Sequence, residues 1–155
     1  MKKNIYIISI IFIILDQLTK ILIVNNFTIG EELTMIKSFF SLTYVINTGG
    51  AFSIFSGSIL FLILVGIIAL ILFDKYILEK KAYKKYELIL YAMLIGGIIG
   101  NLIDRIRLGH VIDFLSFNIL GYNFPVFNLA DIFIVCSISL IVIITLINMK
   151  KQEEK

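Results

Sequence analysis

Four long apolar segments dominate this sequence of 155 residues and limit what it can fold into. They lie at residues 5–24, 57–73, 88–103 and 130–148, and none of them alternates polar with apolar positions as a half-exposed strand would. An α-helix rises about 1.5 Å per residue, so about 20 residues cross the ~30 Å hydrocarbon core of a bilayer. We therefore predict an all-α membrane protein with four transmembrane helices, forming a single integral membrane domain over residues 1–155.

The composition excludes the main soluble classes. Hydrophobic residues make up 59% of the chain and charged residues 16%, with a mean hydropathy of +1.00. A soluble domain has about 45–50% apolar and about 25% charged residues, so a water-soluble enzyme and a disordered chain are both excluded. The formal net charge of +3 comes from lysines at the ends of apolar segments, where membrane orientation explains them, and we expect no nucleic-acid partner.

The basic residues are distributed unevenly between the apolar segments. Ten of the 14 Lys and Arg residues lie before the first segment, in residues 74–87 between the second and third, or after the fourth. The other two connecting segments, residues 25–56 and 104–129, hold only three of them. Basic residues near helix ends are retained in the cytoplasm. We therefore predict that both termini are cytoplasmic and that residues 25–56 and 104–129 are outer loops.

The outer loops are more apolar than loops in free water usually are. Residues 35–46 (MIKSFFSLTYVI) are rich in aromatic and β-branched side chains, a composition typical of short strands. Aromatic residues also collect at the interface between membrane and water. We expect a small β-containing extracytoplasmic platform on the outer ends of the helices, with its strands in the first outer loop.

Four aspartates stand where a charged side chain is costly. Of the 11 acidic residues, seven lie in the inner loop, the tail or the first outer loop, which leaves Asp16, Asp104, Asp113 and Asp131. An ionisable residue inside a membrane helix costs about 2.5–3.5 kcal/mol and is by default a candidate functional residue. These four carboxylates are therefore the first candidates for chemistry.

Asp113 and Asp131 lie on the same predicted side of the membrane. Asp131 falls in the first turn of the fourth segment, three residues after Asn128, so these two side chains share a face. A carboxylate that only favours the positive end of the helix dipole is the alternative for Asp131. Two adjacent carboxylates share one proton and so provide a base and an acid, as in aspartic proteases. If the two aspartates converge, they can activate water for peptide hydrolysis.

Polar residues in the first and third segments have structural and functional interpretations. Asp16 and Lys20 are four residues apart on one helix face, which suits either an intrahelical ion pair or contact with a substrate. Asn101 and Asp104 belong to a polar stripe at the outer end of the third segment. We expect Asp104 and Arg105 to form an interfacial charge pair that supports the site without reacting.

Two stretches that contain glycine carry weaker signals. Residues 47–52 (NTGGAF) have the composition of a turn, because Asn and Gly accept a positive φ angle. The alternative is that the Asn47 amide or the backbone near Gly49 holds a peptide. Gly96 and Gly100 form a small-xxx-small pair, for which we expect close helix packing.

The single histidine and the single cysteine argue against several catalytic designs. The sequence offers no evident partner for His110, so a Ser/His/Asp or Cys/His arrangement has no support. Cys136 lies alone in an apolar segment and is expected in the core. The sequence contains no H-E-x-x-H motif and no glycine-rich phosphate loop. We expect no metal and no cofactor.

Five motifs, taken in order, give the chain a family resemblance. Residues 16–20 (DQLTK), 47–52 (NTGGAF), 100–105 (GNLIDR), 109–114 (GHVIDF) and 127–131 (FNLAD) are similar to the motifs of one family. Each motif alone is weakly specific, but five in this order across nearly the whole chain are highly specific. The chain resembles the bacterial lipoprotein signal peptidases, also called signal peptidase II.

The resemblance implies an aspartyl endopeptidase that removes signal peptides from prolipoproteins, cleaving before the diacylglyceryl-modified cysteine. On the family's motifs the catalytic pair maps onto Asp113 and Asp131. Eight further residues are expected to bind substrate or to support the site: Asp16, Lys20, Asn47, Gly49, Asn101, Asp104, Arg105 and Asn128. The resemblance implies no metal or cofactor.

The resemblance also implies where the protein works and what it contacts. We expect a multi-pass protein of the bacterial cytoplasmic membrane, active at the outer face and monomeric. Its expected partners are diacylglyceryl-modified prolipoproteins, membrane lipids and a cyclic peptide inhibitor such as globomycin. A small proton-coupled transporter and a noncatalytic membrane assembly subunit are the alternatives. Transport is disfavoured because the ionisable groups gather at the outer ends of the helices instead of forming a relay to the inner side.

Overall fold

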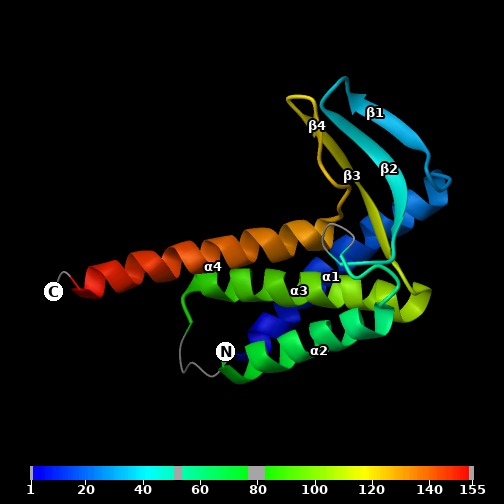
Figure 1. The fold of residues 1–155 in the computed structure, drawn as a ribbon. Helices are drawn as coiled ribbons and strands as arrows, with labels where there is room; N and C mark the ends of the chain where they lie inside the picture. The colour runs from blue at the N-terminus through cyan, green and yellow to red at the C-terminus, as the bar shows by residue number, and fades with distance from the viewer. Residues whose placement is uncertain (1, 51–53, 77–82, 154–155) are drawn as a thin grey trace.

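The structure, a computed structural model, describes residues 2–50, 54–76 and 83–153. Within these ranges a four-stranded antiparallel sheet stands at one end of four helices (Figure 1). In chain order the elements are α1 (Lys2–Asn26), β1 (Glu32–Ile36), β2 (Phe40–Asn47), α2 (Ile59–Tyr76), α3 (Lys85–Leu108), β3 (Val111–Ile119), β4 (Tyr122–Asn123) and α4 (Leu129–Glu153). The sheet meets the helices where α1 and α3 end and α4 begins.

Three helices of the described chain are long and apolar enough to cross a membrane. They are α1, α3 and the part of α4 from Leu129 to Gln152. The chain is therefore a helical membrane protein with a small sheet, which agrees with the apolar segments of the sequence. The fourth predicted span corresponds to α2, which has 18 residues, and its crossing of the membrane stays a prediction.

The helix α3 continues beyond the predicted end of the third segment. It ends at Leu108, and Gly109 follows with a φ of 75°, donating its N–H to the carbonyl oxygen of Arg105. Asp104 and Arg105 therefore lie on the helix, as the polar stripe at its outer end indicated, although our outer loop began at residue 104. Charged residues lower hydropathy without ending a helix, whereas a left-handed glycine does end one.

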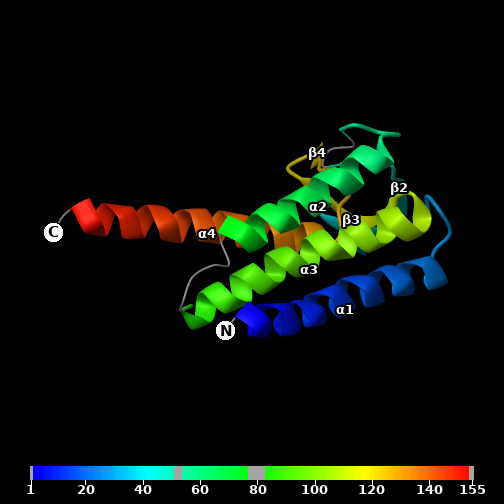
Figure 2. The same ribbon diagram turned by 90° about the horizontal axis from the view of Figure 1, so that it is seen from below.

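Glycines let α3 approach α1 and α4 closely. Figure 2 shows α3 running beside α1. A Cβ atom at Gly97 would lie 2.6 Å from the carbonyl oxygen of Ala130 in α4. Gly96 lies against α1, and a Cβ atom at Gly100 would collide with the carboxylate of Asp16 in α1. The close packing expected at Gly96 and Gly100 is confirmed.

Both segments that we expected as outer loops contribute strands to the sheet. β1 and β2 come from the first, as predicted, but β3 and β4 come from the second, where we expected none. The strand order is β1-β2-β3-β4, and the pairing of β2 with β3 places Val45 opposite Asp113 and Asn47 opposite Val111. Asp113 is buried with the first residues of β3, so an acidic residue on an inner position obscured the strand pattern.

Two contacts fix β3 against the helices. Ile23 near the end of α1 packs with Ile112 and Phe114 in a buried apolar cluster. Phe127 bridges to Leu115 through backbone hydrogen bonds in both directions, at 2.8 and 3.2 Å. The residue after Phe127 is therefore held beside β3 just before α4 begins.

Candidate active site

Asn128 and Asp131 form a reciprocal cap at the start of α4. The backbone N–H of Asp131 donates to Asn128 Oδ1 at 3.0 Å, and the Asn128 N–H donates to Asp131 Oδ2 at 3.2 Å. The cap pairs two backbone donors that a helix start would leave free. Asp131 therefore caps the start of the helix, as our alternative interpretation expected. The cap uses Oδ2 and leaves Oδ1 of Asp131 for a second donor.

Asp113 projects from β3 toward this cap and accepts two amide hydrogen bonds. Asn128 Nδ2 donates to its Oδ1 at 2.7 Å, and Asn47 Nδ2 donates to its Oδ2 at 2.8 Å. The Asn47 amide is oriented by the backbone N–H of Gly49, which donates to Asn47 Oδ1 at 2.9 Å. Asp113 is only 2% exposed. The strand and the two amides hold its carboxylate in one place.

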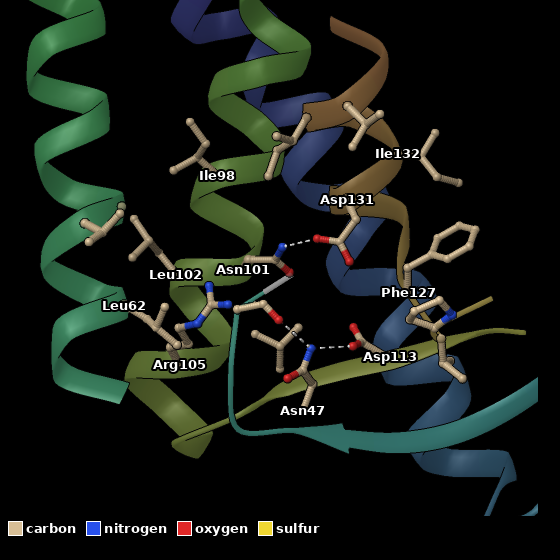
Figure 3. A pocket seen from close by; sticks show the side chains of 18 of the residues that line it. Asn47, Leu62, Ile98, Asn101, Leu102, Arg105, Asp113, Phe127, Asp131 and Ile132 are labelled. Carbon is tan, nitrogen blue, oxygen red and sulfur yellow. Dashed lines mark hydrogen bonds between the residues drawn. The ribbon is translucent and has the colours of Figure 1, made fainter. Parts of the chain in front are cut away.

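Asp113 and Asp131, here called the carboxylate pair, face the same space (Figure 3). Asn128 links them, since its side chain donates to Asp113 and its backbone donates to Asp131. Burial first, and then the charge of Asp131, raise the pKa of Asp113 to about 7. Asp113 can therefore carry a proton near neutral pH.

A buried ion cluster of Asp16, Lys20 and Asp104 lies behind the carboxylate pair. Lys20 Nζ lies 2.9 Å from Asp16 Oδ2 and 2.8 Å from Asp104 Oδ2. The backbone N–H of Ala130 donates to Asp16 at 3.0 Å, and that of Ile112 donates to Asp104 at 3.3 Å. The cluster thus ties α1 and α3 to the starts of α4 and β3.

The ion cluster decides between our interpretations of these residues. The intrahelical pair of Asp16 with Lys20 is confirmed, and neither side chain lines the cavity described below. The expected charge pair of Asp104 with Arg105 is wrong, because Asp104 forms its ion pair with Lys20. Adjacent helical residues point in different directions, so Asp104 faces α1 while Arg105 faces the cavity.

Asn101 connects the ion cluster to the carboxylate pair. Its Oδ1 accepts hydrogen bonds from Lys20 Nζ at 3.0 Å and from Asn128 Nδ2 at 3.1 Å. Its Nδ2 donates to Asp131 Oδ1 at 2.8 Å (Figure 3). Each oxygen of the carboxylate pair therefore accepts an N–H, from Asn47, Asn101 or Asn128.

Arg105 joins α3 to the chain that follows β2. Its Nη2 donates to the carbonyl oxygen of Gly49 at 3.1 Å. Gly49 thereby serves through its backbone, both toward Arg105 and toward Asn47. Residues 51 and 52 of the NTGGAF motif lie outside the described residues.

An apolar cavity of about 700 Å³ opens beside the carboxylate pair. Side chains of α2, α3 and α4 form its walls, among them Leu62, Leu102 and Ile132, and Asp113 and Asp131 lie on its lining (Figure 3). Cys136 also lines it and is exposed, so our expectation of a core cysteine is wrong. A wide apolar space with a few polar groups at one place is the usual form of a ligand site.

The described residues contain no group of three or more His, Cys, Asp and Glu side chains that could hold a metal ion. The polar groups of the site are carboxylates, amides, one ammonium and one guanidinium. This set suits proton transfer and hydrogen bonding to a peptide.

A family model described as signal peptidase (SPase) II matches residues 8–147. The chain belongs to the signal peptidase II family. Lipoprotein signal peptidases, the members of this family, are membrane aspartic endopeptidases that remove signal peptides from prolipoproteins. The resemblance seen in the sequence is confirmed, and the transporter and assembly-subunit alternatives are set aside.

Individual relatives agree with this assignment. The lipoprotein signal peptidase of Clostridium tetani (strain Massachusetts / E88) is 41% identical over 138 residues, covering 88% of each chain. That of Staphylococcus aureus (strain JH9) is 35% identical over 148 residues, covering 96% of this chain and 91% of the relative. A solved structure of a bacterial membrane enzyme is 33% identical, with a TM-score of 0.89, covering 99% of this chain and 93% of that one. A second has a TM-score of 0.82 at 34% identity.

All eight supporting residues expected from the sequence lie in or next to the site, but one contributor was missed. Gln17 Nε2 donates to Asp16 at 3.2 Å, to Asp104 at 3.0 Å and to the carbonyl oxygen of Gly100 at 3.2 Å. Its position beside Asp16 in the DQLTK motif was the available signal. The apolar walls of the cavity had no signal, because they resemble any lipid-facing helix surface.

Proposed function

We propose that the chain removes signal peptides from prolipoproteins with Asp113 and Asp131 as its catalytic pair, cleaving before the diacylglyceryl-modified cysteine. The main support for this proposal is that the two carboxylates share Asn128 as a hydrogen-bond donor and both line an apolar cavity. The family's activity supports the reaction, and the geometry supports the two residues. Eight residues around the pair would bind substrate or hold the pair in place.

The chemistry needs one proton on the pair. Asp131, ionised, takes a proton from a water molecule whose oxygen attacks the scissile carbonyl carbon. Asp113, whose pKa is raised to about 7, carries the proton and donates a hydrogen bond to the carbonyl oxygen. The C–N bond then breaks as Asp131 passes the proton it took from water to the leaving amine. The pair thereby returns to its singly protonated state. The rate should therefore fall both at low and at high pH.

The cavity fits the chemistry of the substrate. Acyl chains and the apolar residues of a signal peptide are favoured against the walls formed by α2, α3 and α4, since both are displaced from water there. Arg105 also lines the cavity and supplies a cation for a peptide carbonyl or a lipid phosphate. A cyclic peptide inhibitor such as globomycin would occupy this space beside the pair.

The proposed setting is the bacterial cytoplasmic membrane, with one membrane domain and four spans. Lysines at the start of α1 and at the end of α4 favour cytoplasmic termini. The sheet and the carboxylate pair would then lie at the outer face, where acyl chains end and water begins. We take the active unit to be a monomer, as the family resemblance implies.

Substitution of the pair tests the proposal directly. Asp113→Asn and Asp131→Asn should each reduce cleavage of a diacylglyceryl-modified prolipoprotein by at least about 1,000-fold, because an amide neither accepts nor supplies the proton. The assay uses purified protein in detergent, with thermal unfolding as the check that each variant folds.

Asp74→Asn is the matched control. Asp74 accepts from Lys2 at 2.8 Å and from Tyr6, at the end of α2 away from the pair, and its loss should leave turnover close to that of the unaltered chain. Near-normal turnover in either folded variant of the pair would show that the assignment of these two residues is wrong.

A further inference from the structure

The orientation of the Asn101 carboxamide decides whether Asp131 faces a hydrogen-bond donor or an oxygen atom. A carboxamide presents an oxygen on one side and an NH₂ group on the other, and a rotation of 180° exchanges them. In the observed orientation Asn101 Nδ2 donates to Asp131 Oδ1. The opposite orientation would place the amide oxygen against the carboxylate oxygen, and that contact is repulsive whenever Asp131 is ionised.

Lys20 removes this ambiguity because an ammonium can only donate. Its Nζ lies 3.0 Å from Asn101 Oδ1, so the oxygen must face Lys20 and the NH₂ group must face Asp131. Asn128 Nδ2 is a second donor to the same oxygen of Asn101. The Asn128 amide is in turn oriented by the backbone N–H of Asp131, which donates to Asn128 Oδ1. Lys20 is 1% exposed, so water does not compete for this contact.

Neutralising the two buried acids does not account for the third contact of Lys20. Asp16 and Asp104 also receive hydrogen bonds from Gln17 and from backbone N–H groups. The ammonium has three donors, and the one not directed at a carboxylate is directed at Asn101. This donor links the ion cluster to the reacting groups.

We propose that Lys20 is a positioning residue that acts on the carboxylate pair through Asn101, holding the amide as a donor to Asp131. The proposal rests on the proposed function, in which Asp113 and Asp131 react. Lys20 does not line the cavity, so it has no contact with substrate in this role.

The charged groups around the pair predict in which direction the pH profile should move when Lys20 is replaced. Lys20 and Asp16 face the site from α1, Asp104 and Arg105 from α3, Asp113 from β3 and Asp131 from α4. The charge of Lys20 lowers the pKa of Asp113 against the effects of burial and of Asp131. Removing the ammonium should therefore raise the pKa of Asp113, and a flipped Asn101 amide would remove the hydrogen bond that stabilises the charge of Asp131.

Lys20→Met is the test, since Met keeps an unbranched stem of four atoms and lacks only the terminal ammonium with its charge and donors. Both limbs of the pH profile of kcat should move to higher pH by about one unit, and the maximal kcat should fall on the order of 10- to 100-fold. KM should change little, because substrate does not reach Lys20. Lys20→Arg, which retains a cationic donor, should restore the position of the limbs.

Gln17→Met is the matched control. It removes hydrogen bonds to Asp16 and Asp104 without touching Asn101, so it should lower the thermal midpoint and leave the pH limbs in place. If Lys20→Met does not fold, Lys20→Met combined with Asp104→Asn keeps the net charge of the ion cluster and should show a smaller alkaline shift, because the lost charge of Asp104 offsets part of the lost charge of Lys20. A double variant that also fails to fold would make Lys20 a folding residue and overturn the proposal.

The outcomes separate this proposal from the proposed function. Limbs that stay in place in folded Lys20→Met, or that move equally in Gln17→Met, would overturn the positioning role alone. Activity in Asp113→Asn or Asp131→Asn would overturn the assignment of the catalytic pair instead.

Discussion

Asp113 is held where its own charge is unfavourable. It is buried on β3 and faces Asp131, and the amides of Asn47 and Asn128 together with the charge of Lys20 offset these two effects only in part. Its pKa is raised from 3.8 to about 7 as a result. The folded protein thus binds a proton that the unfolded chain has released by pH 5, and this costs stability at neutral pH.

The sign of this effect can be measured. Because the folded pKa of Asp113 lies above the unfolded one, its unfavourable contribution is absent below about pH 4. It grows between about pH 4 and 7, at about 1.4 kcal/mol for each pKa unit between the two states, and stays constant above that range. Relative to Asp113→Asn, the unaltered protein should therefore lose stability as the pH rises from 4 to 7.

Thermal or chemical unfolding of both proteins in the same detergent across this pH range is the measurement. The two proteins will differ in their free energy of unfolding by an amount that does not depend on pH, and this part is irrelevant. Only the part of the difference that changes with pH reports the titration of the Asp113 carboxyl group. A difference that does not vary with pH would mean that Asp113 titrates normally in the folded state.

At the residue scale the sequence identifies which side chains meet, but not how they pair. Motif order and the cost of buried charge single out the aspartates, and spacing alone predicts Asp16 with Lys20. The pairing of Lys20 with Asp104 could not be predicted, because it depends on how α1 and α3 are rotated against each other. The adjacent Arg105 was the nearer partner in the sequence, yet it lies on another face of the helix.

Close contacts between helices set the position of the catalytic elements. α4 approaches α3 at Gly97, where the Ala130 carbonyl oxygen leaves no room for a side chain. The N–H of the same Ala130 is bound to Asp16 in α1. The backbone of Ala130 is therefore held by α3 on one side and by α1 on the other, and this fixes the first turn of α4, which carries Asp131.

Gly97→Ala should disturb this arrangement. The added methyl group meets backbone at 2.6 Å, so α4 must shift, at a cost of about 1–3 kcal/mol in the free energy of unfolding. Turnover should fall as well, because Asp131 moves relative to Asn101. Thermal unfolding and the cleavage assay measure the two effects.

Gly66→Ala provides the comparison for stability. A Cβ atom there would lie 2.8 Å from a methyl carbon of Leu102, a flexible side chain that can turn away, so the loss of stability should be smaller. Equal losses in the two variants would contradict the view that the backbone contact at Gly97 is the critical one.

At the scale of elements, hydropathy locates the helices well and their ends poorly. The polar stripe placed Asp104 and Arg105 on the helix, but the outer loop was begun at residue 104 because these charges lower the local hydropathy, and backbone hydrogen bonding continues to Gly109. β3 was missed for a related reason, since a buried acid interrupts the apolar pattern. Both errors fall at residues of the proposed site, where the chemistry requires side chains that the fold alone would not select.

For the whole molecule, the central question is which ends of the helices face the cytoplasm. The distribution of lysines favours cytoplasmic termini, and the sheet would then stand outside. The sheet lies at one end of the helices, and α4 extends away from it beyond the other helices (Figures 1 and 2).

Cysteine labelling tests this topology. In a Cys136→Ser background, Lys37→Cys in the turn between β1 and β2 should react with a membrane-impermeant maleimide in spheroplasts. Lys85→Cys at the start of α3 and Lys151→Cys near the end of α4 should react only after the membrane is permeabilised. Labelling of Lys85→Cys from outside would show that α2 does not cross the membrane.

The order of the active-site residues along the chain has a consequence for biosynthesis. Asp16 and Lys20 are translated first and Asp131 last, and Asn128, which donates to both reacting carboxylates, precedes Asp131 by only three residues. A nascent chain that still lacks α4 holds Asp113 but neither its partner nor the shared donor. With Asp113 and Asp131 as the proposed catalytic pair, the peptidase would be inert throughout its own insertion, and proteolytic activity would begin only when the last helix reaches its place.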